Sequence, residues 1–299
     1  MKQLVNFLSI LILSNPLMSQ NETIYTTSVE DWHAKRIQDL KQEDGWLNLE
    51  GLFWLHKGVN TFGSDSKKDC FYDNIAFPKY LGDFILEGDS VSWVNQIDNG
   101  ALVNKQVITK GKPITIFKWN AEKEKAEVLT YNRFKWVVIK REDKIGIRFR
   151  NLDAKNLTTF KGIERFPVDE KWKLKAVLEK PQDHFLMISN VLGQTTAQKN
   201  AGKLKFEIEG VHYSLDVIDE GGATFFITFA DATSGKTTYG AGRFIVVNKP
   251  DANGNTEIDF NLAYNPPCAF TAFATCPLPP PQNRLKIAIT AGEKNFGHH

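Results

Sequence analysis

The stretch that decides the fold class is Leu204-Lys-Phe-Glu-Ile-Glu-Gly-Val-His-Tyr-Ser-Leu-Asp-Val217, in which apolar and polar residues alternate on both sides of Gly210. A period of two puts every second side chain on the same face, which is typical of a half-buried strand. Because a glycine separates the two runs, the pattern predicts a β-hairpin. This part of the chain is therefore expected to be antiparallel β-structure.

The same pattern extends outward in both directions. Hairpins are predicted for residues 84–94 and 134–150, and single strands for 172–178, 225–229, 243–247 and 258–262. Short strands separated by turns predict a sandwich or a partly closed barrel. One helix is predicted over residues 28–44, with Ser28 as its cap and Gly45 as its stop signal.

The alternation lapses into polar residues over 151–162, which predicts a domain junction there. We therefore expect a mainly β protein with an N-terminal helix and β-sandwich over 20–158. A C-terminal β domain, either a sandwich or a partly closed barrel, is expected over 159–299.

Residues 1–19 are predicted to be a signal peptide. Lys2 supplies the positive region, residues 4–13 are mostly apolar, Pro16 interrupts the pattern, and Ser19 is a small residue before the expected cut. The alternative, an uncleaved anchor, is disfavoured because the apolar run is shorter than the roughly 20 residues that a membrane span requires. The expected location is periplasmic or extracellular, with no membrane span in the mature chain.

Composition excludes some classes of function. The net charge is +2, from 37 basic and 35 acidic residues, which gives no electrostatic reason to expect nucleic acid as a partner. The six histidines show no ligand spacing, so neither a metal nor a cofactor is predicted.

The segment 261–284 is rich in proline, which fixes φ and cannot donate to a sheet, so we expect a long irregular connection. It contains Cys268 and Cys276. In an exported protein a disulfide is the first interpretation, buried free thiols are the second, and a nucleophile or metal ligand is the third. Cys70 is expected to be an unpaired thiol near a strand.

Several polar residues around this connection form the predicted pocket. Asp259 and Asn261 are expected on one face of a strand, directly before the loop. The full candidate set is Tyr239, Arg243, Asp259, Asn261, Tyr264, Asn265, Cys268, Cys276, Arg284 and Glu293. An equally weighted alternative is that the amides and the carboxylate hold the loop by bonding its backbone. The arginines could likewise pair with acids, and Glu293 is expected to be solvated.

The chain resembles the bacterial domain of unknown function 1684 family. The resemblance rests on Asn190-Val-Leu-Gly, Thr238-Tyr-Gly-Ala-Gly-Arg-Phe, Tyr264-Asn-Pro-Pro-Cys-Ala-Phe and Cys276-Pro-Leu-Pro-Pro-Pro. It implies membership only, because the family carries no established activity.

Residues 60–65, 82–86 and 101–104 are similar to forkhead-associated β-sandwiches. Ser64 stands where that pattern has an arginine, and Gly82-Asp83 replaces its serine–histidine segment. The similarity therefore implies a sandwich shape and not phosphopeptide binding, which needs a fixed cation.

Two functions follow from these observations. The first is binding of a small molecule or an extracytoplasmic partner through the C-terminal domain. The alternative is a hydrolase that uses Asp259 or Glu293 as a base, or Cys268 as a nucleophile.

Overall fold

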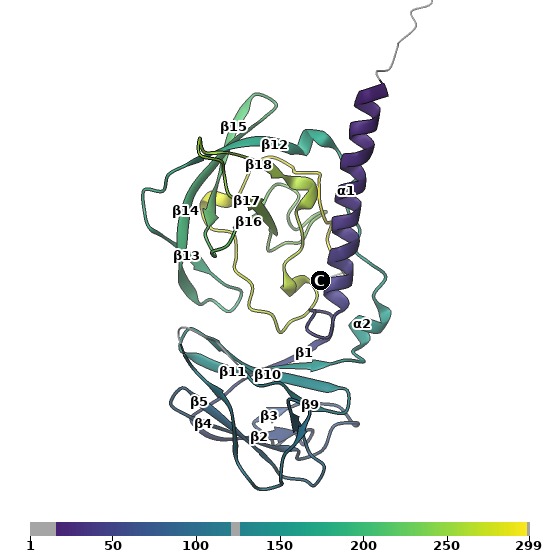
Figure 1. Cartoon of the computed structure of the whole chain (residues 1–299), viewed down its shortest axis with the longest axis vertical. Coiled ribbons are helices and arrows are strands. Elements are labelled where there is room, and N and C mark those ends of the chain that lie inside the picture. The colour runs from purple at the N-terminus through teal and green to yellow at the C-terminus, as the bar shows by residue number, and fades with distance from the viewer. Residues whose placement is uncertain (1–15, 121–125, 298–299) are drawn as a thin grey trace, which may run out of the picture.

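The computed structural model describes the backbone of residues 16–120 and 126–297. The chain is mainly β, with one long helix, two sheets in its first half and a nearly closed, barrel-like sheet in its second half (Figure 1). The predicted fold class is confirmed. The predicted signal peptide lies outside the described residues except for 16–19, which belong to the helix.

Two sheets pack against each other between residues 49 and 151. One has the order β1 (Leu49–Trp54), β11 (Lys144–Asn151), β10 (Phe134–Arg141), β9 (Leu129–Tyr131), β6 (Leu102–Val103) and β7 (Gln106–Val107). The other has the order β3 (Cys70–Phe71), β2 (Gly58–Gly63), β4 (Gly82–Glu87), β5 (Ser90–Asn95) and β8 (Ile114–Lys118). The pairs are antiparallel except β2 with β3.

A single aromatic core joins these sheets into a sandwich. Phe62 and Trp93 come from one sheet, Trp136 and Phe149 from the other, and all four side chains are fully buried. The rings of Phe62 and Trp136 meet edge to face at 5.5 Å between centroids. Aromatic rings fill a core efficiently in this arrangement, so the sandwich buries its apolar faces without a helix between them.

The barrel-like sheet has the order β17 (Arg243–Asn248), β16 (Thr224–Phe229), β15 (Val211–Ile218), β14 (Thr195–Ile208), β12 (Lys173–Glu179) and β18 (Asn255–Asp259), and β13 (Phe185–Ser189) pairs with β14. Short helices occur at α2 (Lys155–Thr159) and, as 3₁₀ turns, at η1 (Glu170–Trp172), η2 (Phe260–Leu262), η3 (Pro267–Ala269) and η4 (Pro281–Asn283). The predicted hairpin is confirmed, with Leu204 opposite Leu215 and Phe206 opposite Tyr213. Its turn has Gly210 at φ +80°, a conformation that glycine adopts without strain.

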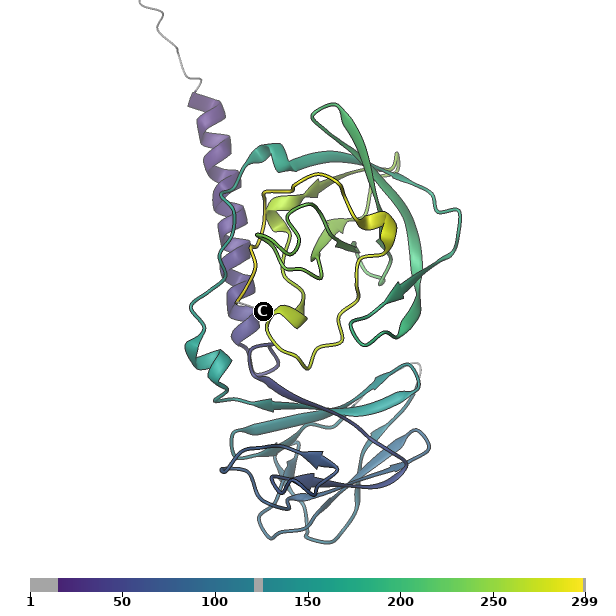
Figure 2. The ribbon, with the colours of Figure 1, turned by 180° about the vertical axis from the view of Figure 1, so that it is seen from behind.

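In Figure 2 the irregular C-terminal segment lies inside the outline that the strands of this sheet form. Leu285, Ile289 and Ala291 belong to the buried core of the barrel. Asn283 anchors the segment, because its side chain bonds both the N–H and the carbonyl of Asp216 and the carbonyl of Thr228. The segment is therefore partly packed as core, with Pro279 and Pro280 buried and Pro281 exposed.

The long helix α1 (Pro16–Lys41) differs from the prediction at both ends. Ser28 is internal and its hydroxyl donates to the carbonyl of Tyr25, so it is not the cap. Gly45 has no positive φ, so it is not a left-handed stop. Glycine fits here because a Cβ would lie 2.3 Å from the carbonyl oxygen of Leu40. The helix runs along the side of the barrel (Figure 1). The described residues contain no helix with the length and apolar character needed to cross a bilayer.

Candidate binding groove

Arg243 is a structural anchor in the barrel. Its side chain is fully buried, its Nη2 donates to Asp231 Oδ2 at 2.8 Å, and it also donates to the carbonyls of Ile289 and Ala291. Burial lowers the pKa of Arg243, and the charge of Asp231 opposes this shift. The guanidinium therefore ties β17 to the C-terminal segment, the pairing that the sequence offered as the alternative to a ligand contact.

Glu293 was expected to be a solvated acid, and this is wrong. Its side chain is 1% exposed and accepts a bond from Arg36 Nε at 2.7 Å and another from the backbone N–H of Asn265 at 2.7 Å. Arg36 also donates to the carbonyl of Asn265 at 2.8 Å. The acid is buried because the helix supplies a cation that sequence spacing alone did not connect to it.

His33 faces the same acid from one turn earlier in the helix, with Nδ1 3.9 Å from a Glu293 oxygen. Burial lowers the pKa of His33; Glu293 opposes the shift, while Arg165 and Arg36 add to it. Its Nε2 lies 3.2 Å from the carbonyl of Ile163. The imidazole is therefore held neutral in the folded protein near pH 7.

Asp259 and Asn261 meet, but not as neighbours on a strand. β18 ends at Asp259, and Asn261 lies in the 3₁₀ turn η2, where its backbone N–H donates to the carboxylate of Asp259. The carboxylate also accepts from the hydroxyl of Tyr25 on α1 at 2.8 Å, and Asn261 bonds the backbone N–H and carbonyl of Asp169. Burial and the bond to Asp259 raise the pKa of Tyr25. These groups fix the helix to the barrel.

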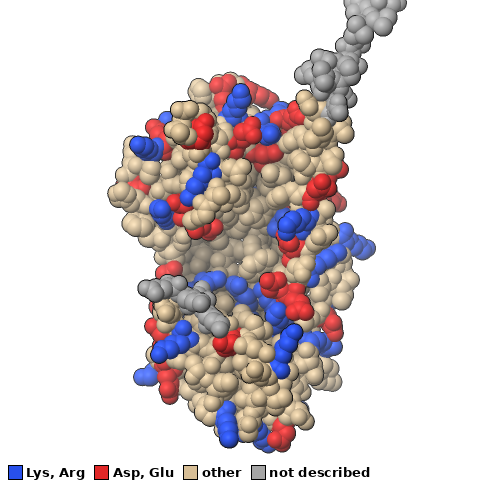
Figure 3. Space-filling view, viewed as in Figure 1, with Lys and Arg blue, Asp and Glu red and all other residues tan. Residues whose placement is uncertain are grey.

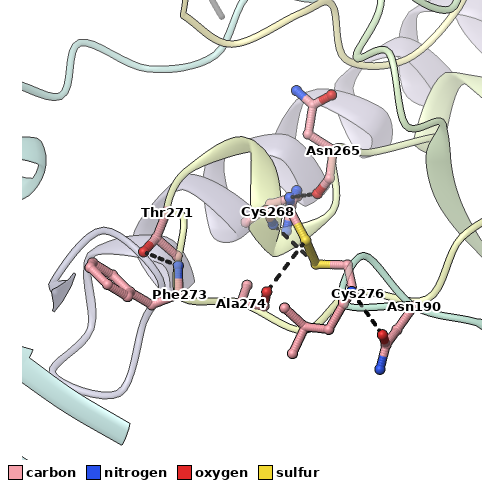
Figure 4. The surroundings of a disulfide bond; sticks show 9 residues. Asn190, Asn265, Cys268, Thr271, Phe273, Ala274 and Cys276 are labelled. Atoms are coloured by element: carbon pink, nitrogen blue, oxygen red, sulfur yellow. Dashed lines mark hydrogen bonds between the residues drawn. A yellow bond between two sulfur atoms is a disulfide. The ribbon is translucent and has the colours of Figure 1, made fainter. Parts of the chain in front are cut away.

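Cys268 and Cys276 form a disulfide across the loop that follows η3 (Figure 4). The first of the three interpretations of these cysteines is thus the one observed. Within the loop, Thr271 donates its hydroxyl to the carbonyl of Leu49, which attaches the loop to the sandwich. Cys70 is buried and unpaired, and burial raises its pKa to about 12.

Two predicted residues lie away from these contacts. Arg284 is exposed, and its closest recorded bond is to the carbonyl of Pro279 at 3.5 Å. Tyr239 is half-buried against a small cluster that includes Leu40 and Phe270, and burial raises its pKa. Within the described ranges, no three His, Cys, Asp or Glu side chains gather in a way that could hold a metal ion.

Tyr264 is the predicted residue that borders an open cavity. The cavity is a groove of about 380 Å³ between α1 and β17, and we call it the helix groove. Trp32 and Tyr264 both line it and contact each other, with ring centroids 6.1 Å apart, and the guanidinium of Arg36 lies 4.4 Å from the Tyr264 ring centre. Burial raises the pKa of Tyr264 to about 12. The lining is completed by Lys35, Asp39, Val246 and Leu262.

The residues that α1 contributes to this groove were not among the sequence candidates. Trp32 and Arg36 are four apart, a spacing that puts both side chains on one face of a helix. The sequence therefore did contain a signal that these two side chains lie together. The missing information was which part of the barrel the face would meet.

Comparison with known protein families gives a match to the second half of the chain. Residues 158–294 match the family model described as "Protein of unknown function (DUF1684)". This match agrees with the sequence resemblance to the same family. The region begins within α2 and contains all the strands of the barrel-like sheet. The helix groove therefore combines Tyr264, Val246 and Leu262 of the matched region with residues of α1, which precedes it.

Among solved structures, an uncharacterized protein from Haloarcula marismortui, determined by NMR in solution, is 27% identical to the chain. The match covers 48% of this chain and 82% of the other, with a TM-score of 0.41. Residues 1–466 of Rad53 in complex with AMP-PNP match at 14% identity and a TM-score of 0.19, covering 75% of this chain and 49% of the other. No curated protein matches the chain significantly.

Proposed function

We propose that the protein is an exported binding protein that holds a small planar molecule in the helix groove. The observation that carries the proposal is the aromatic pair of Trp32 and Tyr264, which faces an open cavity of about 380 Å³ with a guanidinium at its base. Ligand sites are typically concave and mostly apolar, with a few polar groups that fix orientation. The helix groove has this composition.

The polar groups indicate which part of a ligand is recognised. Arg36 uses Nε and Nη2 to bond Glu293 and Asn265, and its Nη1 has no hydrogen bond within the described residues. A guanidinium held by two bonds is fixed in position, so a carboxylate or carbonyl of the ligand would meet a preorganised donor. The flat body of the ligand would then pack on the aromatic surface that Trp32 and Tyr264 form together.

Export is supported by two independent features. The first residues of the chain have the charge and apolar pattern of a signal peptide, and Cys268 and Cys276 form a disulfide, which persists mainly in oxidising compartments. Tyr25 makes its bond to Asp259 downstream of the expected cut, so removal of residues 1–19 would leave the helix attached.

The hydrolase alternative has less support. Cys268 is bonded to Cys276, Asp259 caps a turn, and Glu293 pairs with Arg36, so each of the proposed bases or nucleophiles is already engaged. None of the three borders the helix groove.

The test is binding of planar aromatic carboxylates to the mature chain, measured by tryptophan fluorescence and ligand-detected NMR. Benzoate, nicotinate and indole-3-acetate are suitable probes. We expect Trp32→Leu to abolish binding, whereas Trp119→Leu, which alters a half-buried tryptophan of the sandwich, leaves it unchanged. No response from any probe up to about 10 mM, beyond the millimolar range in which weak ligands bind, would refute the proposal.

A further inference from the structure

A second cavity, of about 410 Å³, lies between the barrel and the sandwich. We call it the interdomain cavity. Figure 3 shows the molecule hollowed between its upper and lower halves on this side. The walls come from three places: the turn between β10 and β11, the β13–β14 hairpin, and the disulfide loop near Thr275 and Pro277. Because both halves contribute, the cavity exists only in the assembled chain.

One wall of the interdomain cavity is a row of neutral polar side chains. Gln194, Thr196 and Gln198 follow at every second position, so they share one face. They are linked locally: Gln198 donates to the hydroxyl of Thr196 at 2.9 Å, and Asn190 donates to the amide oxygen of Gln194 at 3.1 Å. A carboxamide can donate two and accept two hydrogen bonds, so these contacts leave donors and acceptors for a ligand.

The floor is apolar and includes one fixed aromatic ring. Ile188 and Ile218 are buried there, and the half-buried ring of Phe226 packs beside them. Phe226 meets Phe244 edge to face, with centroids 4.8 Å apart and planes at 77°. This contact restrains the ring, so it offers a defined flat surface to whatever enters.

The rim is charged and predominantly acidic. It carries two carboxylates, those of Glu142 and Glu220, and one guanidinium, that of Arg141. None of the three forms an ion pair with a described residue. Glu142 also has φ +54° in a two-residue turn, where glycine, asparagine or aspartate is favoured.

We propose that the interdomain cavity binds a neutral or amine-bearing saccharide unit. Sugar hydroxyls both donate and accept, which matches the row of amides and hydroxyls, and the C–H face of a sugar ring packs on an aromatic surface. The two carboxylates at the rim repel an anionic sugar and attract an amine. This inference does not depend on the helix groove, which has a different lining and a different ligand.

The test is titration of the mature chain with glucosamine, cellobiose and N,N′-diacetylchitobiose, with galacturonate as the anionic probe, followed by calorimetry and protein NMR. We expect millimolar or tighter binding of at least one neutral or amine-bearing probe and weaker binding of galacturonate. Gln198→Leu, which keeps the size of the side chain, should weaken binding by up to about tenfold, since that is the most that the loss of one hydrogen bond typically costs. Lys199→Gln, on the opposite and exposed face of β14, should leave it unchanged.

Glu142→Gly separates function from folding. Glycine relieves the positive φ, so the melting temperature should rise by about a degree or more while affinity for the amine-bearing probe falls. Trp32→Leu should not alter saccharide binding, which distinguishes failure of this inference from failure of the helix groove. Absence of binding for every neutral or amine-bearing probe at about 10 mM, or preference for galacturonate, would overturn the inference.

Discussion

The contact between Arg36 and Glu293 predicts how strongly the N-terminal helix stabilises the barrel. Glu293 is 1% exposed, and its oxygen lies 2.7 Å from Arg36 Nε. Removing one partner of a buried ion pair costs about 3–5 kcal/mol, because the other charge is left without compensation. Since Arg36 keeps 16% of its side chain exposed, we take the lower end, about 3 kcal/mol, for Arg36→Met.

The assay is urea unfolding followed by tryptophan fluorescence, with thermal melts in parallel. A loss of this size lowers the melting temperature by about 6–12 °C, at about 2–4 °C for each kcal/mol. Lys35→Met is the matched control, because Lys35 pairs with Asp39 four residues on while both remain mostly exposed, and such a pair contributes about 0.3–0.5 kcal/mol. The double variant Arg36→Met with Glu293→Gln should lose less than the sum of the two single variants, by about 1 kcal/mol or more. If Arg36→Met and Lys35→Met unfold at the same urea concentration, the buried-pair argument is refuted.

Three further predictions concern other parts of the fold. Burial lowers the pKa of His33 below its unfolded value near 6.5, so the free energy of unfolding should fall as the pH drops below about 6.5. His33→Gln should reduce this pH dependence in thermal melts between about pH 5 and 8, a range that brackets the unfolded pKa. Replacing Cys268 and Cys276 by serine should cost roughly 2–3 kcal/mol in urea unfolding, and mass spectrometry without reductant should find their peptides linked. Gly242→Ala should destabilise by more than about 1 kcal/mol, because φ is +93° and the new Cβ would lie 2.5 Å from a carbonyl oxygen, whereas Gly88→Ala, with positive φ but open space around it, should cost less.

The β-structure was predictable because its signals are local. The alternation around Gly210 predicted the two strands of the hairpin, and the structure pairs Leu204 with Leu215 and Phe206 with Tyr213. The helix was less predictable at its start. Residues before Ser28 carry no apolar period, and they are helical where Tyr25 bonds the barrel, a contact that no local pattern encodes.

The candidate residues were identified more reliably than their roles. Arg243 and Glu293 do have specific partners, but these are Asp231 and Arg36, and both pairs are buried. Spacing can indicate that a polar residue needs a partner, because an unpaired buried charge is costly. It cannot indicate whether that partner is another side chain or a ligand, since the energetic requirement is the same in both cases.

In this molecule, structural anchors and candidate binding residues differ in how much of their hydrogen-bonding capacity is already used within the protein. Arg243 and Asn283 direct their donors to backbone carbonyls of segments that they fix, so they have little capacity left for a ligand. Gln194 and Gln198 are instead half-buried beside a cavity, and each uses only part of its hydrogen-bonding capacity. The loop that contains the prolines and the cysteines is anchored to the barrel, so it gives the interdomain cavity one rigid wall. Binding specificity would therefore reside in the side chains around the loop rather than in the loop itself.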